Sequence, residues 1–232
     1  MADPPRRANL LIRRGLPYAE GERLQKEALA GMAADPAAGG WLILAEHPPL
    51  VTCGRSGDGG NLLVGRERLT ALGIGFHSAG RGGDVAFHGP GQWTVYPILR
   101  LDWFGRDLHR YLRLLEECAI RFLSAYGVAA GRRPGLTGAW VGRDKAAAVG
   151  IAVSRWITWH GFALNIHPDL PLFASLMRPC GIAAERGGVT SLDRLTGERH
   201  GMGETIPVLR EALAEVLELE IRDCCCNPAA SR

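Results

Sequence analysis

Apolar residues recur at helical spacing in several stretches of the chain, most regularly over residues 107–126. There they return every three or four positions, the spacing of one buried helix face, at Leu108, Tyr111, Leu112, Leu115, Ala119, Phe122 and Leu123. Gly127 follows directly and is a typical residue at a helix end. We therefore expect a helix over 107–126, and less regular patterns predict helices over 18–32, 66–72, 170–177 and 206–219.

Runs of apolar and β-branched residues between turn residues predict strands. These runs cover 9–14, 41–46, 50–53, 92–99, 139–141, 146–153 and 157–166, with a shorter strand or hairpin arm at 84–88. The turn at 142–144 joins two of them as a hairpin, and 131–138 is expected to be a loop. Strands mixed with isolated helices predict an α/β (α+β) fold with a mostly antiparallel mixed sheet flanked by helices. We expect one domain over residues 1–221 and a loose tail over 222–232.

The stretch 81–96, RGGDVAFHGPGQWTVY, combines glycines and a proline with a short alternating run and a following strand. Glycine lets the backbone approach a ligand closely, and the strand after it is rigid. Arg81 and His88 are therefore held at fixed positions beside backbone N–H groups that can point at a ligand. We interpret the stretch as part of a binding site. The alternative is a glycine-rich connection between two strands.

Composition limits the possible classes of protein. With 232 residues, 47% of them hydrophobic and 22% charged, the chain is typical of a globular protein. No apolar run approaches the roughly 20 residues of a membrane helix, and the first residues lack the apolar core of a signal peptide. A net charge of +3 is too even for a nucleic-acid binder. We expect a cytoplasmic protein with no nucleic-acid or membrane partner.

Two residues are candidates for nucleophilic chemistry, although an ordinary turn cysteine is the alternative for Cys180. Cys180 stands between Pro179 and Gly181, which favour an exposed turn, and a nucleophilic thiol needs exposure and a nearby cation. Lys145 and Lys26 are the only lysines among 27 basic residues. A lysine can change its protonation state where arginine cannot. Lys145 opens a strand that can pair with 157–166, whose end leads to Cys180.

The histidines do not indicate a metal site. His47, His88 and His160 lie in separate motifs, and none has a recognised ligand spacing. We expect no catalytic metal and no cofactor. His160 and Gly161 interrupt an otherwise apolar strand, and such a glycine marks a close approach to the backbone. The alternative for His160 is a structural histidine of the strand.

Six motifs occur in the order and spacing of the lipoyl(octanoyl) transferases. They are EHPP with TCGR over 46–55, RGGDVAFHGPGQ over 81–92, KAAAVGI over 145–151, WHGFALNI over 159–166, RPCGI over 178–182 and GGVTSL over 187–192. The chain closely resembles this family from about residue 11 to 217. The resemblance implies a fold related to the catalytic domains of biotin and lipoate protein ligases. It also implies octanoyl transfer from octanoyl-acyl carrier protein to a lysine of apo lipoyl domains, those of 2-oxoacid dehydrogenase complexes and glycine cleavage H protein.

The same resemblance implies roles for individual residues. Cys180 would carry the acyl thioester as the catalytic nucleophile, and Lys145 would tune it. The substrate-binding residues would be Arg81, Gly82, Gly83, Asp84, Val85, Ala86, Phe87, His88, Ala148, Val149, Gly150, His160, Gly161, Phe162 and Ala163. Two departures stand out: the family usually has Thr-Tyr at Ala86-Phe87, and the Cys224–Cys226 triplet has no counterpart in the family pattern.

Two other functions compete with the transferase. An ATP-dependent lipoate or biotin ligase would share the fold, but it activates the acid as an adenylate and needs no cysteine nucleophile. The chain also lacks a Gly-Lys-Ser/Thr phosphate loop. A non-catalytic acyl-carrier-protein binding module is the second alternative, and the presence of both Cys180 and Lys145 argues against it.

Overall fold

The computed structural model describes residues 5–182 and 187–228, with the backbone alone described at Cys180. The strands are β1 (Arg6–Arg14), β2 (Gly40–Glu46), β3 (Leu50–Cys53), β4 (Gly75–Ser78), β5 (Val85–His88), β6 (Gln92–Ile98), β7 (Gly131–Arg133), β8 (Leu136–Val141), β9 (Asp144–Ser154), β10 (Ile157–Asn165) and β11 (Leu219–Asp223). The α-helices are α1 (Tyr18–Ala34), α2 (Arg66–Ala71), α3 (Leu108–Ala125), α4 (Leu170–Leu176), α5 (Leu192–Thr196) and α6 (Ile206–Leu217). Short 3-10 turns cover Leu101–Phe104, Pro179–Gly181 and Gly203–Thr205.

The strands form two sheets. The larger has the order β11-β1-β2-β6-β10-β9-β8-β7, and the smaller has the order β4-β3-β5. In the larger sheet β1 runs parallel to both of its neighbours, and all other neighbouring pairs are antiparallel. The predicted mixed sheet, mostly antiparallel and flanked by helices, is confirmed.

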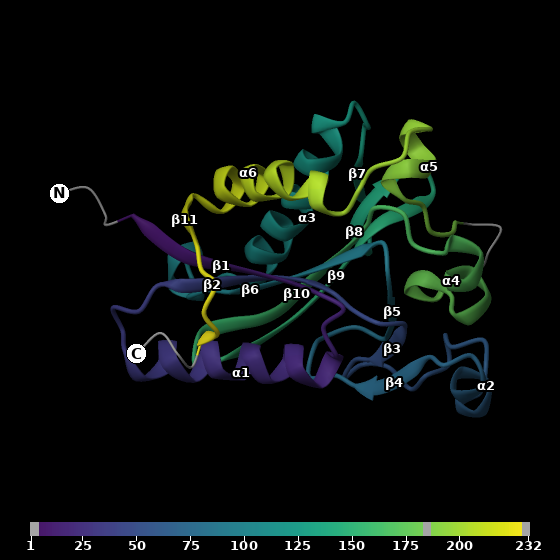
Figure 1. Cartoon of the computed structure of the whole chain (residues 1–232), viewed down its shortest axis with the longest axis horizontal. Helices are drawn as coiled ribbons and strands as arrows, with labels where there is room; N and C mark the ends of the chain where they lie inside the picture. The colour runs from purple at the N-terminus through teal and green to yellow at the C-terminus, as the bar shows by residue number, and fades with distance from the viewer. Residues whose placement is uncertain (1–4, 183–186, 229–232) are drawn as a thin grey trace.

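Helices cover both faces of the larger sheet (Figure 1). α3 and α6 lie on one face, where their apolar residues pack with those of the sheet into one large core. α1 lies on the opposite face over a second cluster of buried apolar residues. The smaller sheet, with α2 and α4, stands at one end of the molecule and has a third cluster. The two sheets meet where the stretch 81–96 passes from β5 to β6.

α3 forms where the apolar spacing predicts it. Asp107 caps its start, because the side chain accepts a hydrogen bond from the backbone N–H of Arg110 at 3.0 Å. Leu108 at its first turn is exposed, whereas Tyr111, Leu115 and Phe122 of its apolar face are fully buried. Each such side chain stabilises the fold by about 1.5–3 kcal/mol. This rigid helix supports the edge of the sheet formed by β8 and β9.

Two sequence predictions are wrong at the edges of the larger sheet. Residues 131–138, expected to be a loop, contain β7 and the start of β8, which pair antiparallel. The last helix ends at Leu217 and not at 219, since Glu218 takes a left-handed conformation with φ 53° and the chain turns into β11. β7 and β11 are short, partly polar edge strands, so their sequences lack the apolar alternation by which strands are recognised.

The tail expected from residue 222 begins later in the structure. β11 extends to Asp223 and pairs with β1, and the backbone N–H of Cys224 donates to the carbonyl of Leu10 at 2.9 Å. Arg13 then donates to the carbonyl of Cys225 and to the side chain of Asn227. The residues after 228 lie outside the described part of the chain.

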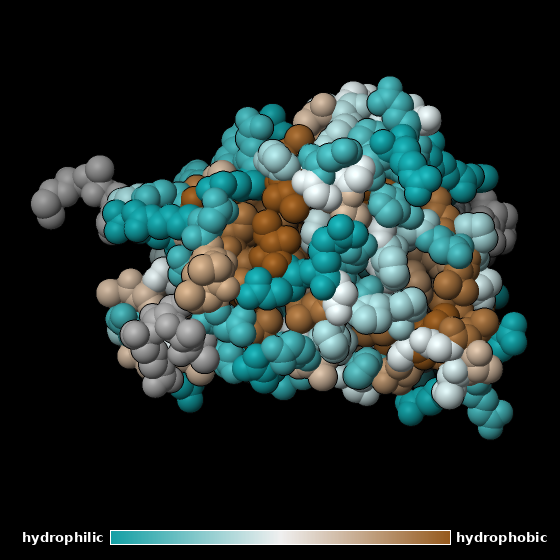
Figure 2. Space-filling model, viewed as in Figure 1, coloured by the Kyte–Doolittle hydropathy of each residue, from teal (hydrophilic) through white to brown (hydrophobic). Residues whose placement is uncertain are grey.

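The surface is mostly hydrophilic in the view of Figure 2, with hydrophobic residues showing beside α4 at the end that carries the smaller sheet. Within the residues that the structure describes, no helix is both long enough and apolar enough to cross a membrane.

Candidate active site

A cavity of about 160 Å³ lies between the larger sheet and β5 of the smaller one. Its walls come from β6, β9 and β10, from the loop before β5, and from the segment between α4 and the Pro179–Gly181 turn. The size is close to that of the roughly 150 Å³ apolar cavities that bind a benzene ring in engineered proteins. The cavity can therefore hold a small apolar group.

Most of the residues expected at the binding site line this cavity. They are Arg81, Gly83, Asp84, Val85, Ala86, Phe87, His88, Lys145, Ala148, Val149, Gly150, His160, Gly161, Phe162 and Ala163. Gly82 is not in the lining; its backbone N–H donates to the carbonyl of Ile151 at 2.8 Å and ties the loop to β9. The structure thus brings together motifs that are far apart in the sequence.

Cys180 lies in the Pro179–Gly181 turn, and Pro179 lines the cavity. The side chain of Cys180 is outside the described part of the structure. The segment is attached on both sides: the backbone N–H of Arg178 donates to the carbonyl of Asn61 at 2.9 Å, and Lys145 pairs with Val189 farther on. The residue before the turn is thus held to Asn61, and Pro179 of the turn lines the same cavity as Lys145.

Lys145 is buried near the start of β9, with 6% of its surface exposed. Its Nζ lies over the ring of Trp140, 4.8 Å from the ring centroid. Its backbone N–H donates to the carbonyl of Gly188, and its carbonyl accepts from the N–H of Thr190, both at 2.9 Å. A buried amine at the wall of an apolar cavity can assist acyl transfer by charge or by proton exchange.

The floor beneath Lys145 depends on Gly138. A Cβ built on this residue would lie 2.3 Å from the carbonyl oxygen of Ala147 and 3.2 Å from Cε of Lys145, and its φ of 122° favours glycine. The backbone N–H of Gly138 donates to Oε1 of Glu116 at 2.9 Å. The register of β8 against β9 shifts just after it, between Ala139 and Trp140. The carboxylate of Glu116 thus holds the irregular part of β8 on which the lysine packs.

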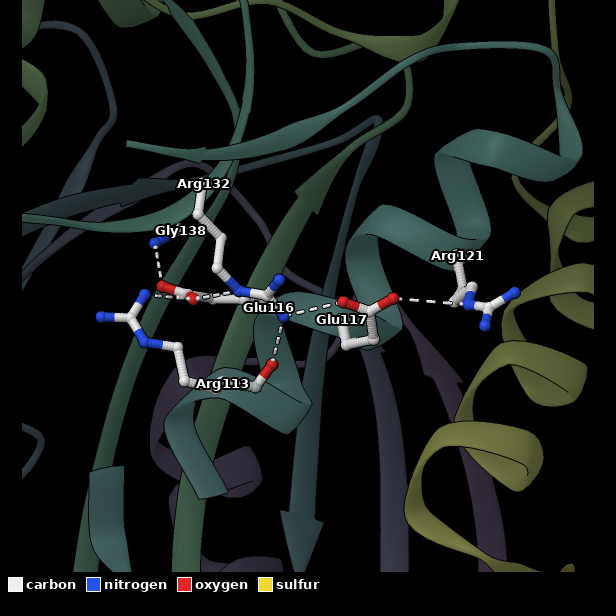
Figure 3. Close-up of polar contacts among 6 residues, drawn as sticks. All are labelled: Arg113, Glu116, Glu117, Arg121, Arg132 and Gly138. Atoms are coloured by element: carbon white, nitrogen blue, oxygen red, sulfur yellow. Dashed lines mark hydrogen bonds and ion pairs between the residues drawn. The ribbon is translucent and has the colours of Figure 1, made fainter. Parts of the chain in front are cut away.

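Glu116 is fully buried on α3, and two arginines balance its charge (Figure 3). Oε2 accepts from Arg113 at 2.6 Å and from Arg132 at 3.0 Å. Arg132 also binds the neighbouring Glu117 at 2.7 Å. A buried carboxylate is stable only when it is paired and hydrogen-bonded in this way.

A chain of hydrogen bonds crosses the centre of the cavity wall. Arg81 donates to the carbonyl and the hydroxyl oxygen of Thr52, at 2.9 and 2.7 Å. The Thr52 hydroxyl is 3.3 Å from Nε2 of His88, and Nδ1 of His88 is 2.9 Å from Oε1 of Gln92. The amide of Gln92 donates to Asn165 at 2.9 Å. Because an amide oxygen accepts, we assign the proton of His88 to Nδ1.

His88 and Arg81, two members of this hydrogen-bond chain, are buried away from water. Desolvation lowers the pKa of His88 well below its ordinary value, and the charges of His47 and Arg81 lower it further. The ring is therefore neutral at pH 7. Desolvation also lowers the pKa of Arg81 from its ordinary value. Among the described residues, Arg81 forms no salt bridge, and carbonyl and hydroxyl oxygens provide its partners.

Three side chains of this wall were missed by sequence reasoning, although the sequence holds a signal for them. Gln92, Thr94 and Tyr96 alternate along β6, so all three point to the same face of the sheet. Gln92 follows the GPG turn that was singled out. Tyr18, at the start of α1, also lines the cavity, and no local pattern distinguishes it from other helix residues.

His160 has a strained backbone at the other end of the cavity. Its φ is 57°, uncommon for a residue other than glycine. Its backbone N–H donates to Oε1 of Gln25 on α1 at 2.7 Å, which holds the conformation. Burial, with the charge of Arg81, lowers the pKa of His160 to about 3, so the ring is neutral. Next to it, a Cβ on Gly161 would meet the carbonyl of Val95 at 2.2 Å, so the adjacent strand approaches closely.

The two residues that depart from the family pattern line the cavity. Phe87 packs against Phe173 of α4 with ring centroids 5.1 Å apart. Ala86 pairs with Thr52 across β3 and β5. The departure makes this wall apolar at both positions.

No group of three His, Cys, Asp or Glu side chains in residues 5–182 and 187–228 is placed to hold a metal ion. In the triplet, Sγ of Cys225 and Sγ of Cys226 are 4.0 Å apart, and both residues are exposed.

Sequence comparison relates the chain to known proteins. Residues 17–214 match the family model of the lipoyl protein ligase A/B catalytic domain. A protein of Rubrobacter xylanophilus named octanoyltransferase is 45% identical over 223 residues, which is 90% of this chain and 96% of that protein. An octanoyltransferase of Geobacter metallireducens is 46% identical over 181 residues, 78% of this chain and 80% of that protein.

Solved structures share the fold at low sequence identity. A bipartite lipoate protein ligase of Thermoplasma acidophilum, described with its E2 lipoyl domain, superposes with a TM-score of 0.74 at 16% identity and covers 96% of this chain and 88% of its own. A biotin protein ligase of Aquifex aeolicus in complex with biotin and ATP gives a TM-score of 0.52 at 14% identity, over 91% of this chain and 70% of its own.

Proposed function

The chain belongs to the lipoyl protein ligase A/B catalytic-domain family, and on that premise we propose that it is an octanoyltransferase that acts through Cys180. The donor is octanoyl-acyl carrier protein. The acceptors are apo lipoyl domains of 2-oxoacid dehydrogenase complexes and the glycine cleavage H protein. The chain up to the end of β11 at Asp223 acts as a single catalytic domain. The observation that carries the proposal is the cavity, which is lined by apolar residues and has a buried lysine beside the Cys180 turn.

The reaction proceeds in two exchanges. The Cys180 thiolate attacks the carbonyl carbon of the donor thioester; a new C–S bond forms, the old one breaks, and the carrier thiolate leaves and takes a proton. The amine of the acceptor lysine then attacks the acyl-cysteine, forms an amide and releases the Cys180 thiolate, and the amine loses a proton. The first exchange replaces one thioester by another, so it is nearly isoenergetic and needs no ATP.

Lys145 assists both exchanges. As a cation it lowers the pKa of the Cys180 thiol, because a positive charge favours the thiolate. As an ammonium it gives a proton to the leaving carrier thiolate, and as the resulting amine it accepts one from the acceptor lysine. Its burial supports this role, since charges act more strongly where water is excluded.

The acyl chain occupies the cavity between the two sheets. Val85, Phe87, Val149 and Phe162 provide apolar walls. Burial contributes about 0.8 kcal/mol for each methylene, so a cavity of fixed length discriminates between chains. Of the backbone N–H groups considered for the tetrahedral oxyanion, around Gly150, Gly161 or Gly181, those of the Cys180 turn are the candidates, because Gly150 and Gly161 pair next to His160 and Ile151.

The relatives favour the transferase over the alternatives. The Rubrobacter xylanophilus octanoyltransferase matches along almost its whole length. The fold neighbours that are ligases share little sequence: a lipoate-protein ligase A bound with ATP is 16% identical, and the biotin protein ligase is 14% identical. The presence of both Lys145 and Cys180 argues against a non-catalytic binding module.

The test is turnover with purified components. The chain is mixed with octanoyl-acyl carrier protein and an apo lipoyl domain in the absence of ATP, and the mass of the lipoyl domain is followed. The transferase adds one octanoyl group. Modification that requires free octanoate and ATP identifies a ligase, and no modification under either condition supports a binding module.

A further inference from the structure

Three buried polar atoms of residues that line the cavity have no hydrogen-bond partner in the described part of the chain. One is Oδ1 of Asp84, a half-buried residue whose other carboxylate oxygen accepts from Asn61. The remaining two belong to neutral side chains. They are the hydroxyl oxygen of Tyr18 and Nε2 of His160. Both residues are more than nine-tenths buried, with 7% and 2% of their surface exposed. Buried polar atoms nearly always have a partner, because leaving them unpaired costs free energy. Two such atoms on one cavity wall therefore indicate a polar group of a ligand.

These atoms lie at the end of the cavity away from the reacting groups. Lys145 is near the start of β9, and its side chain crosses to Trp140 on the neighbouring β8. His160 pairs with Ile151, in the second half of β9. An acyl chain attached beside Lys145 and buried along β9 therefore points its far end toward His160.

Tyr18 belongs to the same end. Its ring centroid is 5.8 Å from that of His47, and Nε2 of His47 is 2.8 Å from the hydroxyl of Tyr96. The ring of Tyr96 in turn contacts His160 edge to face, with centroids 6.4 Å apart. The hydroxyl of Tyr96 is hydrogen-bonded to His47. At this end of the cavity, the atoms without a described partner are therefore those of Tyr18 and His160.

Both groups are neutral hydrogen bonders at pH 7. Burial raises the pKa of Tyr18 to about 12 and lowers that of His160 to about 3. The nearby Arg81 already donates to the oxygens of Thr52 and Gly82. An ionised ligand group would therefore lose its hydration at this site without gaining an ion-pair partner, because the donors of Arg81 already bind these oxygens. A neutral hydroxyl, which both donates and accepts, matches the site.

We propose that this end of the cavity is a hydrogen-bonding subsite and that the protein takes acyl chains bearing a terminal hydroxyl. The proposal deepens the proposed function, because it names a further substrate class for the same cavity. A hydroxyl at the chain end pairs with Tyr18 and His160. An alkyl chain of equal length buries a methyl group against them and leaves both atoms unpaired.

Binding of free acids tests the subsite without relying on catalysis. Each ω-hydroxy acid is compared by calorimetry with the alkanoic acid of equal heavy-atom number, from 8-hydroxyoctanoate with nonanoate up to 11-hydroxyundecanoate with dodecanoate. We expect the hydroxy acid to bind about three- to tenfold more tightly at the length that reaches the subsite, as one added hydrogen bond provides.

Tyr18→Phe removes one of the two proposed partners and leaves His160, and we expect it to reduce the preference. The ratio is taken within each variant, so a general loss of affinity cancels. Tyr126→Phe is the matched control, since Tyr126 lies at the end of α3 against His200, and it should keep the wild-type ratio.

Several results overturn the subsite: tighter or equal binding of the alkanoic acid at every length, no binding of either acid, or a preference that Tyr18→Phe leaves unchanged. Octanoyl transfer is assayed on the same preparation. A preparation that prefers hydroxy acids and does not transfer octanoyl groups contradicts the proposed function and leaves the subsite standing.

Discussion

Nζ of Lys145 lies over the indole ring of Trp140, 4.8 Å from the ring centroid. A cation at this position is attracted by the electron-rich face of the ring. The stem of the lysine rests on Gly138, where a Cβ would approach Cε to 3.2 Å. The Lys145 side chain thus packs between the Trp140 ring and the backbone of Gly138, and its amine lies at the cavity wall.

Substitution of Lys145 separates its charge from its proton transfer. Lys145→Ala removes both and should raise the pKa of the Cys180 thiol and suppress acyl-enzyme formation. Lys145→Arg keeps the charge and cannot give up a proton. We expect it to form acyl-enzyme and to pass the acyl group to a lipoyl domain about a hundredfold more slowly, as the loss of a general acid and base predicts.

Single-turnover rates of the two exchanges measure this difference. Lys26→Arg is the control, because Lys26 lies on the exposed face of α1 in an ion pair with Glu22. A Lys145→Arg protein with both rates near wild type would show that only the charge is needed.

Glu116 and Glu117 provide a matched pair for stability. Glu116→Gln replaces a buried carboxylate that accepts from Gly138, Arg113 and Arg132, and we expect a loss of about 2–3 kcal/mol in the free energy of unfolding. Glu117→Gln breaks pairs that face solvent and should cost no more than about 1 kcal/mol. Urea unfolding measures both. Equal losses would contradict the role given to the buried carboxylate.

Stability should fall between pH 7 and pH 5. Burial lowers the folded-state pKa of His47, His88 and His160 below the value of about 6.5 expected in the unfolded chain. Below about pH 6.5 these histidines bind protons more readily in the unfolded state than in the folded state. The contribution of these residues is therefore complete above about pH 6.5 and is lost as the pH falls, by up to about 1.4 kcal/mol per pH unit for each histidine.

His160→Asn tests one part of that slope, because asparagine tolerates the positive φ. The variant should show a smaller loss of unfolding free energy between pH 7 and pH 5 than the wild-type protein. His109→Asn changes an exposed histidine of α3 and should keep the wild-type slope. A His160→Asn slope equal to that of the wild type would mean that the ring takes up its proton over the same pH range in the folded and the unfolded states.

Chelation should leave the activity unchanged. The proposed exchanges use a thiol and an amine, and no group in the described part of the chain is placed to hold a metal. Turnover after dialysis against a strong chelator is compared with turnover before it. A loss that zinc reverses would contradict the prediction.

The sequence pattern alone predicted the elements that have a regular apolar spacing or a continuous apolar run. α3 follows directly from its repeating apolar face, and β2 from a run that is buried at every position. β7 and β11 could not be predicted, because both are short and partly polar: β7 pairs with β8, which follows it directly, and β11 depends on pairing with the distant β1.

The parts of the site that lie in glycine-rich motifs could be predicted from the sequence. The stretch 81–88 and the strand residues around Gly150 and Gly161 all reach the cavity, apart from Gly82. Glu116 could not be foreseen: on the sequence it is one acidic residue of a helix, and only the packing of α3 against β8 buries it beneath Gly138. Tyr18 is similar, since its place depends on how α1 docks.

The central claim is that the acyl group passes through Cys180. The protein is incubated with octanoyl-acyl carrier protein without an acceptor, quenched, digested and mapped by mass spectrometry. We predict one octanoyl adduct on Cys180, absent from Cys180→Ser and discharged when an apo lipoyl domain is added before the quench. An adduct on Cys53 or within Cys224–Cys226 while Cys180 stays free, or transfer that persists in Cys180→Ser, would contradict the account.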